Sequence, residues 1–254
     1  MSPWLLINLP SDMIDLHSHL LPGIDDGAVD LDDALKLVEI AVEDGITHSV
    51  ITPHIHLNRY DNDVHSIQAA YTILQQALLA RSIPLRIAFA AEVRIDPQVM
   101  TMIAGNKIPF LGKLGGYKIL LLEFPHSMIL PGTVKFIKYL LSHNIRPLVA
   151  HPERNKAVLT HLEKIEPIRE AGAMLQVTAR SITGGFGPYA KKRALQMLER
   201  GWIDVVATDA HNLVHRPPRL QAAFDMVCQH AGEGVAVRLF QEMPAAISAV
   251  HFGL

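Results

Sequence analysis

Short apolar, β-branched runs alternate along this chain with longer amphipathic stretches. The predicted strands are residues 13–16, 49–52, 86–91, 118–122, 147–150, 174–177 and 205–208. The predicted helices are residues 31–43, 64–81, 132–144, 156–171, 188–200 and 219–231. Strands that alternate with helices indicate a parallel α/β fold. The near-continuous apolar strands agree, because such strands are covered on both faces of a sheet.

The chain of 254 residues is predicted to be one domain, since it shows no linker or low-complexity segment and barrels of about 250 residues are routinely one domain. A net charge of −2 gives no reason to expect nucleic acid or an anionic membrane as partner. The apolar residues 4–9 are too few to span a membrane and lack the basic flank of a signal peptide. With Cys228 as the single cysteine, no internal disulfide can form. We therefore expect a soluble, cytoplasmic protein.

Two histidines one residue apart follow the first predicted strand. In an extended backbone, side chains at i and i+2 point to the same side, so His17 and His19 can bind one metal ion together. A second pair, Asp209 and His211, follows the last predicted strand in the same way. These two pairs predict a metal site that is assembled from distant parts of the chain.

Ligand-type residues also follow the second to fifth predicted strands. They are His54, Glu92, Glu123 and His151. In a βα barrel these positions share the rim where active sites form. Mixed imidazole and carboxylate ligands suit manganese, iron, zinc, cobalt or nickel, and the absence of cysteine from the set disfavours a structural zinc site. So many ligands predict two or three ions that share carboxylates, an arrangement that can activate water and clamp both oxygens of an in-line phosphoryl displacement.

Two neighbouring aspartates, Asp25 and Asp26, follow soon after His19. One interpretation is a turn and an N-cap for the next helix. The other is that one aspartate binds metal, and we favour Asp26 for that role. Both interpretations can hold, one for each residue.

Two arginines lie just past predicted ligands. Arg154 is three positions after His151, and Arg216 is five positions after His211. Arginine forks match phosphate oxygens, so we expect a phosphate-binding pair, with ordinary surface arginines as the alternative. The glycine-rich residues 184–187 are predicted to be a plain connection rather than a phosphate loop.

The remaining histidines and the cysteine are not expected to take part in the chemistry. Those in predicted rim loops, within reach of a substrate, are His56, His65, His126 and His215. Those on other faces or ends are His48, His143, His161, His230 and His251. A thiol-based phosphatase is disfavoured because Gly234 stands where an arginine would follow Cys228.

Taken in order, the motifs resemble the polymerase and histidinol phosphatase (PHP) superfamily. Within it, they are similar to the bacterial capsule-locus protein-tyrosine phosphatases that partner tyrosine autokinases. The motifs are His17-Ser-His19 with Leu21-Pro-Gly-Ile-Asp-Asp-Gly27, Thr52-Pro-His54, Ala91-Glu92, Leu122-Glu123-Phe124, Ala150-His151-Pro-Glu-Arg154, and Thr208-Asp209-Ala-His211-Asn212 with Arg216-Pro-Pro218. Residues 1–12 precede the matched region and are predicted to be an extension without a matched role.

The resemblance implies a distorted, seven-stranded barrel of the TIM type with three catalytic metals, usually manganese or iron. It implies a first ion on His17, His19, Glu92 and Asp209, a second on Glu92, Glu123 and His151, and a third on Asp26, His54 and His211. It assigns the phosphate to Arg154 and Arg216.

The expected activity is metal-dependent hydrolysis of phosphotyrosine in protein. By resemblance, the expected partner is the C-terminal tail of a tyrosine kinase of polysaccharide synthesis or export. Two alternatives stay open: a phosphatase for histidinol phosphate or another small phosphomonoester, and a metal-binding regulator of the kinase with little turnover.

Overall fold

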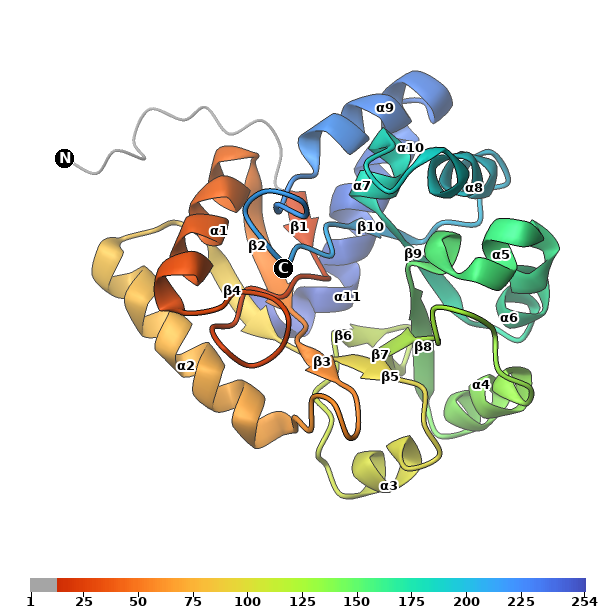
Figure 1. Cartoon of the computed structure of the whole chain (residues 1–254), viewed down its shortest axis with the longest axis horizontal. Helices are drawn as coiled ribbons and strands as arrows, with labels where there is room; N and C mark the ends of the chain where they lie inside the picture. The colour runs from red at the N-terminus through yellow and green to blue at the C-terminus, as the bar shows by residue number, and fades with distance from the viewer. Residues whose placement is uncertain (1–12) are drawn as a thin grey trace.

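The computed structural model describes residues 13–254, so the predicted extension at residues 1–12 lies outside the described part. Parallel strands form two sheets, and helices surround them (Figure 1). The smaller sheet has the order β1 (Met13–Asp15), β2 (Ile46–Ile51) and β4 (Arg86–Phe89). The larger sheet has the order β10 (Val205–Ala207), β9 (Met174–Thr178), β8 (Ile145–Ala150), β7 (Tyr117–Glu123), β5 (Glu92–Arg94) and β3 (His54–Ile55). This arrangement confirms the predicted parallel α/β class.

Just after two of the predicted strands, 49–52 and 86–91, the chain forms a second short strand that joins the larger sheet. The segment that begins with β2 continues as β3, and the one that begins with β4 continues as β5. Pro53 lies between β2 and β3 and lacks the N–H needed for regular pairing. The two segments stay in contact, since Ala90 N–H donates to Ile51 O (2.8 Å) and Glu92 N–H donates to Pro53 O (3.1 Å). The predicted single strands 49–52 and 86–91 are therefore wrong in their bounds.

The loops after β1 and β10 also meet. His19 N–H donates to Ala210 O (2.8 Å), and Asp209 N–H donates to His17 O (2.7 Å). Ser18 and Ala210 form an isolated parallel bridge. The first and last strands of the chain therefore bring their carboxyl ends together, and these ends carry the two predicted ligand pairs.

The helices follow the predicted amphipathic stretches in most places. The helices α1 (Leu31–Glu43) and α2 (Val64–Arg81) have the predicted bounds. Their N-caps are Asp30 and Asp63, whose side chains accept hydrogen bonds from first-turn N–H groups. The helices α4 (Thr133–Ser142), α8 (Pro188–Glu199) and α9 (Gln221–Ala231) lie within predicted ranges.

The predicted helix 156–171 is wrong, because three short pieces replace it. They are α5 (Lys156–Thr160), the 3-10 helix η3 (Leu162–Ile165) and α6 (Glu166–Glu170). His161 has an extended backbone with φ of −137°, which ends α5. Pro167 lies in the first turn of α6, and in a continuous helix it would break the preceding hydrogen bond.

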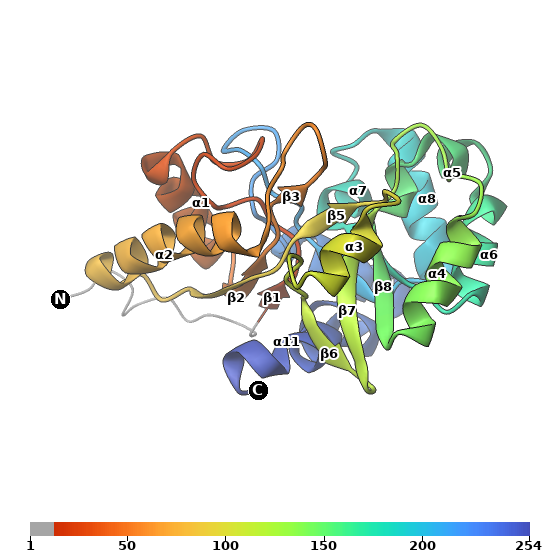
Figure 2. The same cartoon turned by 90° about the horizontal axis from the view of Figure 1, so that it is seen from below.

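Several short elements have no counterpart among the predicted ones. They are α3 (Val99–Ala104), β6 (Gly112–Leu114), the 3-10 helix η2 (Pro152–Arg154), α7 (Ala179–Thr183), α10 (Glu233–Val237), the π-helical turn η4 (Arg238–Glu242) and α11 (Met243–Phe252). β6 pairs antiparallel with β7. Figure 2 shows α11 at the lower end of the molecule, below β1 and beside β6. The amino ends of the strands are therefore covered there.

Apolar side chains fill both faces of the sheets. The larger cluster packs the helices against the strands, and a smaller one lies between the strands and α11. The smaller cluster includes Ile14, Val50, Leu121 and Leu148 from the strands and Ile247 from α11. Burial on both faces explains the near-continuous apolar strands and gives a rigid base to the residues that follow them. No helix within residues 13–254 is long and apolar enough to cross a bilayer.

Candidate metal centre

The two ligand pairs predicted from the first and last strands meet at one point. The Nε2 atoms of His17 and His19 lie 3.3 Å apart. Asp209 Oδ1 lies 3.3 Å from His17 Nε2 and 3.6 Å from His19 Nε2. All three side chains are buried. The backbone bonds between the loops after β1 and β10 hold these side chains together.

Glu92, the first residue of β5, lies at the centre of the cluster. Its Oε2 is 3.2 Å from His17 Nε2, 3.3 Å from His19 Nε2 and 3.1 Å from His54 Nδ1. Its Oε1 is 2.7 Å from His151 Nε2. The two oxygens therefore face different histidines, as expected of a carboxylate that bridges two ions.

The described residues form three groups that could each hold a cation, with all donor atoms of a group within 4.8 Å of one another. The groups are His17, His19, Glu92 and Asp209; His19, Asp26, His54 and His211; and His54, Glu92 and Glu123. His151 contacts the shared Glu92. The structure thus brings together every residue that the sequence singled out as a ligand.

The donor atoms fit metal ions because several are buried without a hydrogen bond. His54 Nδ1, Glu92 Oε2, Glu123 Oε2 and Asp209 Oδ1 are buried and lack a hydrogen bond among residues 13–254. Unpaired buried polar atoms are costly and rare in folded proteins. Imidazole nitrogens and carboxylate oxygens at this spacing are the ligands that first-row divalent metals prefer. The residues present therefore fit a cluster of such ions.

The structure separates the roles of the neighbouring aspartates. Asp25 is directed inward: its Oδ2 lies 2.7 Å from His19 Nδ1 and accepts a bond of 2.9 Å from His54 N–H. Asp26 Oδ1 instead faces the cavity, 3.3 Å from His54 Nε2 and 3.6 Å from His211 Nε2. Asp25 also accepts a hydrogen bond from Gly27 N–H, and this bond forms a local turn. The N-cap of the next helix is Asp30, so the predicted capping role for this pair is wrong.

Buried partners orient the histidines of the first pair. Asp25 contacts Nδ1 of His19, and Gln176 Oε1 lies 2.8 Å from Nδ1 of His17. In both cases Nε2 stays free to face the cluster, which is how ligating histidines are usually fixed. Sequence reasoning missed Gln176, and the signal available was its place as a polar residue in the middle of the strand β9.

Gly27 shows why the loop after His19 requires glycine. A Cβ atom at this position would lie 2.1 Å from the carbonyl oxygen of His19. No rotation of a side chain relieves this overlap, because both atoms belong to the backbone or its first carbon. The loop therefore lies directly against the histidine that it positions.

The charges of the cluster favour metal binding. Burial opposes ionisation of Glu92, but His17, His54 and His151 hold its pKa well below the usual range. Burial likewise opposes ionisation of Asp209, yet Arg154, His17 and Arg216 lower its pKa strongly. These carboxylates are therefore anions near neutral pH.

His211 is held in its neutral form. Burial lowers its pKa to about 3, and the neighbouring His19 and Arg216 act in the same direction. A neutral imidazole has a lone pair available for a metal ion. His211 Nδ1 lies 3.0 Å from Asp209 O, which leaves Nε2 facing Asp26 and the cavity.

Both predicted arginines reach the cluster from the side. Arg154 and Arg216 donate to Asp209 Oδ2, the oxygen that faces away from His17. Each side chain is about one-fifth exposed, at 19% and 22%. The arginines therefore lie between the buried ligands and the solvent, where a bound anion can reach them.

The cluster opens into a cavity of about 250 Å³. Its lining includes most of the predicted ligands, both arginines and four further residues that were not assigned a role: His56, Arg59, Arg94 and His126. Arg94 forms an ion pair with Glu123, with 3.0 Å between Arg94 Nη1 and Glu123 Oε1. Arg59 and Arg94 are functional candidates that sequence reasoning missed, because neither directly follows a predicted strand.

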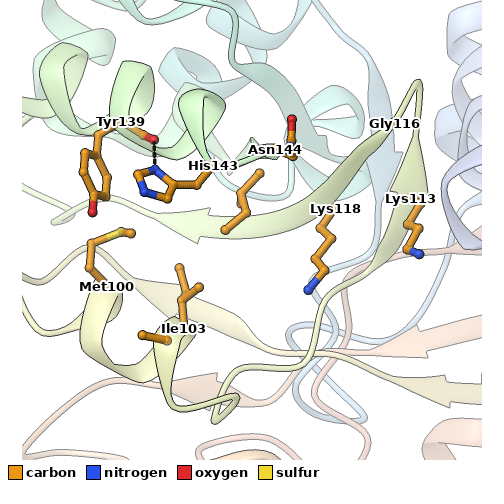
Figure 3. A pocket seen from close by; sticks show the side chains of 10 residues that line it. Met100, Ile103, Lys113, Gly116, Lys118, Tyr139, His143 and Asn144 are labelled. Carbon is orange, nitrogen blue, oxygen red and sulfur yellow. Dashed lines mark hydrogen bonds between the residues drawn. The ribbon is translucent and has the colours of Figure 1, made fainter.

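A second and larger hollow lies at the amino ends of β7 and β8. This groove has a volume of about 620 Å³. Figure 3 shows Met100 and Ile103 of α3 on one side, Tyr139 of α4 with His143 just after this helix on another, and Lys118 nearby. The His143 ring donates to Tyr139 O at 2.9 Å. Among residues 13–254, no carboxylate lines the groove, so this part of the chain does not supply it with the ligands of the rim cavity.

The fold and the cluster together define a class: parallel α/β proteins with a candidate metal site at the carboxyl ends of the strands. A family model described as "Capsular polysaccharide synthesis, CpsB/CapC" matches residues 13–249. The chain belongs to this family.

Bacterial relatives agree with this assignment. The chain is 33% identical to the tyrosine-protein phosphatase YwqE of Bacillus subtilis over 83% of this chain and 82% of that protein. It is 28% identical to the tyrosine-protein phosphatase CpsB of Streptococcus agalactiae over 94% of this chain and the whole of that protein.

Solved structures show the same architecture. One match comes from crystal structures of YwqE from Bacillus subtilis and CpsB from Streptococcus pneumoniae, described as metal-dependent tyrosine phosphatases. It has a TM-score of 0.86 at 30% identity and covers 92% of this chain and 94% of that chain. A histidinol phosphate phosphatase from Lactococcus lactis matches with a TM-score of 0.55 at 12% identity, covering 91% and 98% of the two chains. That second likeness concerns the fold alone.

Proposed function

We propose that this protein is a metal-dependent phosphatase that hydrolyses phosphotyrosine in proteins. The observation that carries the proposal is the convergence of three cation-binding groups with two arginines in one cavity. The family relatives named as tyrosine-protein phosphatases support the substrate class. The two sheets, joined by the contact between the β1 and β10 loops, are proposed to form the distorted seven-stranded barrel implied by the sequence.

The proposed ligand sets follow the resemblance drawn from the sequence. The first ion would be bound by His17, His19, Glu92 and Asp209, the second by Glu92, Glu123 and His151, and the third by Asp26, His54 and His211. One observed group is the same as the first proposed set. Another contains the whole third set together with His19. The remaining observed group contains Glu92 and Glu123 of the second set together with His54. The third member of that set, His151, lies 2.7 Å from Glu92. Manganese is the expected metal, with iron, cobalt or zinc as alternatives.

Bound divalent cations would polarise the phosphate and make a water nucleophile available near neutral pH. The protein's own side chains would bind the phosphate and stabilise its charge. Arg154 and Arg216 offer in-plane N–H donors that match the non-bridging phosphate oxygens, and they would stabilise charge on these oxygens in the transition state. Both share Asp209 Oδ2, so an arriving phosphate would compete for them with a carboxylate that would also hold a metal ion. A phenolate leaves more readily than an alkoxide, which reduces the need for a strong general acid.

The proposed physiological substrate is the phosphorylated tail of a tyrosine autokinase of polysaccharide synthesis or export. The family description, which refers to capsular polysaccharide synthesis, supports this setting. We place the reaction in the cytoplasm, because the chain has a single cysteine and no internal disulfide.

A direct test compares two substrates on manganese-loaded protein. We expect release of phosphate from a phosphotyrosyl peptide of a kinase tail to exceed release from histidinol phosphate by at least about 100-fold in kcat/KM, because the competing substrate lacks the aryl leaving group. A chelator should abolish both activities, and added manganese should restore them. Activity that survives in metal-free protein would refute the metal mechanism, and a preference for histidinol phosphate would refute the substrate assignment.

The same assay separates an enzyme from a metal-binding regulator. An enzyme turns over p-nitrophenyl phosphate repeatedly, whereas a regulator binds the kinase tail without phosphate release. Loss of turnover in His151→Ala, with the wild type active, supports the enzymatic role.

A further inference from the structure

One aromatic side chain, Phe186, contacts both arginines of the cavity. The guanidinium carbon of Arg154 lies 4.2 Å from the centre of the Phe186 ring, and that of Arg216 lies 5.8 Å from it. Both distances fall within the range of a cation–π contact. Both arginines also donate to Asp209. Each guanidinium therefore contacts the same carboxylate and the same ring.

Three glycines shape the loop that carries this ring. Gly184 and Gly187 have φ of 94° and 88°, a region that favours glycine. A Cβ atom at Gly185 would lie 2.4 Å from Cγ of Arg180. Gly185 N–H also donates to Arg180 O at 2.8 Å. The backbone on both sides of Phe186 thus follows a path that other residues would strain, and this path sets where the ring lies.

A buried carboxylate ties this loop to the segment that carries Arg154. Glu153 is fully buried. Its Oε1 accepts from Thr178 N–H at 3.0 Å and from Ser181 Oγ at 2.6 Å. These partners lie at the start of α7 and within it, and α7 leads directly into the glycine-rich loop. The ring and Arg154 are therefore fixed to one another through the backbone as well as by their own contact.

The two contacts on each guanidinium differ in whether they use its N–H donors. A carboxylate occupies N–H donors, whereas an aromatic face attracts the cation without using any in-plane donor. Arg216 Nε is buried and has no hydrogen-bond partner within residues 13–254. An anion in the cavity can take up such donors while the ring keeps the guanidinium planes in place.

We propose that Phe186 is a positioning residue that holds both arginines in the orientation needed to bind the substrate phosphate. This inference rests on the proposed role of the two arginines in phosphate binding. Long arginine side chains lose much rotational freedom when they bind an anion. A ring that restricts them beforehand reduces this loss, so phosphate binds more tightly to the same donors.

The test measures inhibition by inorganic phosphate and the KM for p-nitrophenyl phosphate in the manganese-loaded, full-length protein. Phe186→Leu should raise the inhibition constant and the KM about tenfold, because it removes both cation–π contacts. Phe186→Met serves the same purpose if the leucine variant is unstable. Phe186→Tyr keeps the ring and should stay within about twofold of the wild type. Metal content and Tm should be unchanged in all these variants.

Tyr189 supplies a matched control in the same region. It is an aromatic residue three positions away with 73% of its surface exposed, and Tyr189→Leu should leave both constants unchanged. The positioning role is overturned if Phe186→Leu binds phosphate as the wild type does, or if Phe186→Tyr is impaired as strongly as the leucine variant.

A second comparison separates this inference from the proposed function. Arg154→Lys should lose most of the inhibition by phosphate. If Arg154→Lys is still inhibited as strongly as the wild type, the arginines do not bind phosphate and both proposals fall. If Arg154→Lys loses inhibition but Phe186→Leu does not, the proposed function stands and only the role of Phe186 is refuted.

Discussion

The cavity at the carboxyl ends of the strands and the groove at their amino ends differ in size and in chemistry. The groove is the larger, at about 620 Å³ against about 250 Å³. It has apolar walls with Lys113 and Lys118, whereas the cavity gathers carboxylates, imidazoles and guanidiniums. The two hollows lie at opposite ends of β7, a seven-residue strand that spans roughly 20 Å. Volume alone therefore does not locate the active site; converging polar groups with displaced pKa values do.

The two ends also differ in what they contribute to stability. The lower end contains apolar packing between the strands and α11, which favours folding. The opposite end, where the carboxyl ends of the strands lie, buries Glu92, Asp209 and His17 next to one another. Buried charges need compensation. Cations in the cluster would supply it, so metal binding and folding should be coupled at this end only.

The largest difference between the ends should appear on changing Asp209. Asp209→Asn removes the charge that faces His17 and both arginines, so kcat/KM for p-nitrophenyl phosphate should fall by more than about 10³-fold. The groove variant Lys118→Ala should stay within about twofold of the wild type, because exposed substitutions away from the site have small effects. Steady-state kinetics with manganese checks both. Equal losses in the two variants would remove the distinction between cavity and groove.

A smaller loss is expected from Arg216→Lys. Lysine keeps the charge but not the planar fork, and loss of one donor to a transition-state oxygen costs about 10²-fold in kcat. Metal content should stay at the wild-type level, because the Arg216 side chain bonds to Asp209 through Oδ2, whereas Oδ1 is the oxygen that faces His17. Elemental analysis beside the kinetics tests this, and loss of metal from the variant would assign Arg216 to the metal cluster instead.

Two glycines allow the carboxyl ends and the amino ends of the strands to be perturbed separately. Gly27→Ala should weaken manganese binding about 10- to 100-fold, because its Cβ would displace the loop against His19. Gly112→Ala should leave manganese affinity unchanged but lower the free energy of unfolding by about 1–3 kcal/mol, since its Cβ would overlap the carbonyl of Ile247 in α11. Metal titration and urea unfolding measure the two effects, and a swap of the two outcomes would contradict the account.

The smallest expected effect concerns a carboxyl group at the lower end. Burial raises the pKa of Asp204 above its ordinary value, despite the bond from Leu175 N–H and the nearby Arg169. Just above the ordinary pKa, the folded state therefore holds a proton that the unfolded state has lost. Stability should fall as the pH rises through the folded pKa, and Asp204→Asn should lack this dependence. Urea unfolding of metal-free protein between pH 4 and pH 7 tests the sign.

The sequence was most informative where a polar residue interrupts an apolar run. Each predicted ligand lies at the carboxyl end of a strand, in the loop after it, or at the start of β3 or β5, and a shared rim places such residues together. Periodicity also gave the bounds of α1 and α2, because both carry a side-chain N-cap.

The wrong element bounds and the missed partners have physical causes other than the periodicity of apolar residues. The helix expected at 156–171 is divided at His161 and Pro167 by backbone geometry. The break between β2 and β3 depends on the second sheet that β3 joins. The partners of the histidines, Asp25 and Gln176, depend on contacts between distant segments. Such pairings arise only when the chain is folded.

The central claim is that several cations lie together in the rim cavity. The most direct test is diffraction from a crystal grown with manganese, recorded at the manganese absorption edge. The account predicts two or three adjacent anomalous peaks among His17, Glu92, Glu123, Asp209 and His211. A cavity without such peaks, or manganese bound only elsewhere on the molecule, would contradict it.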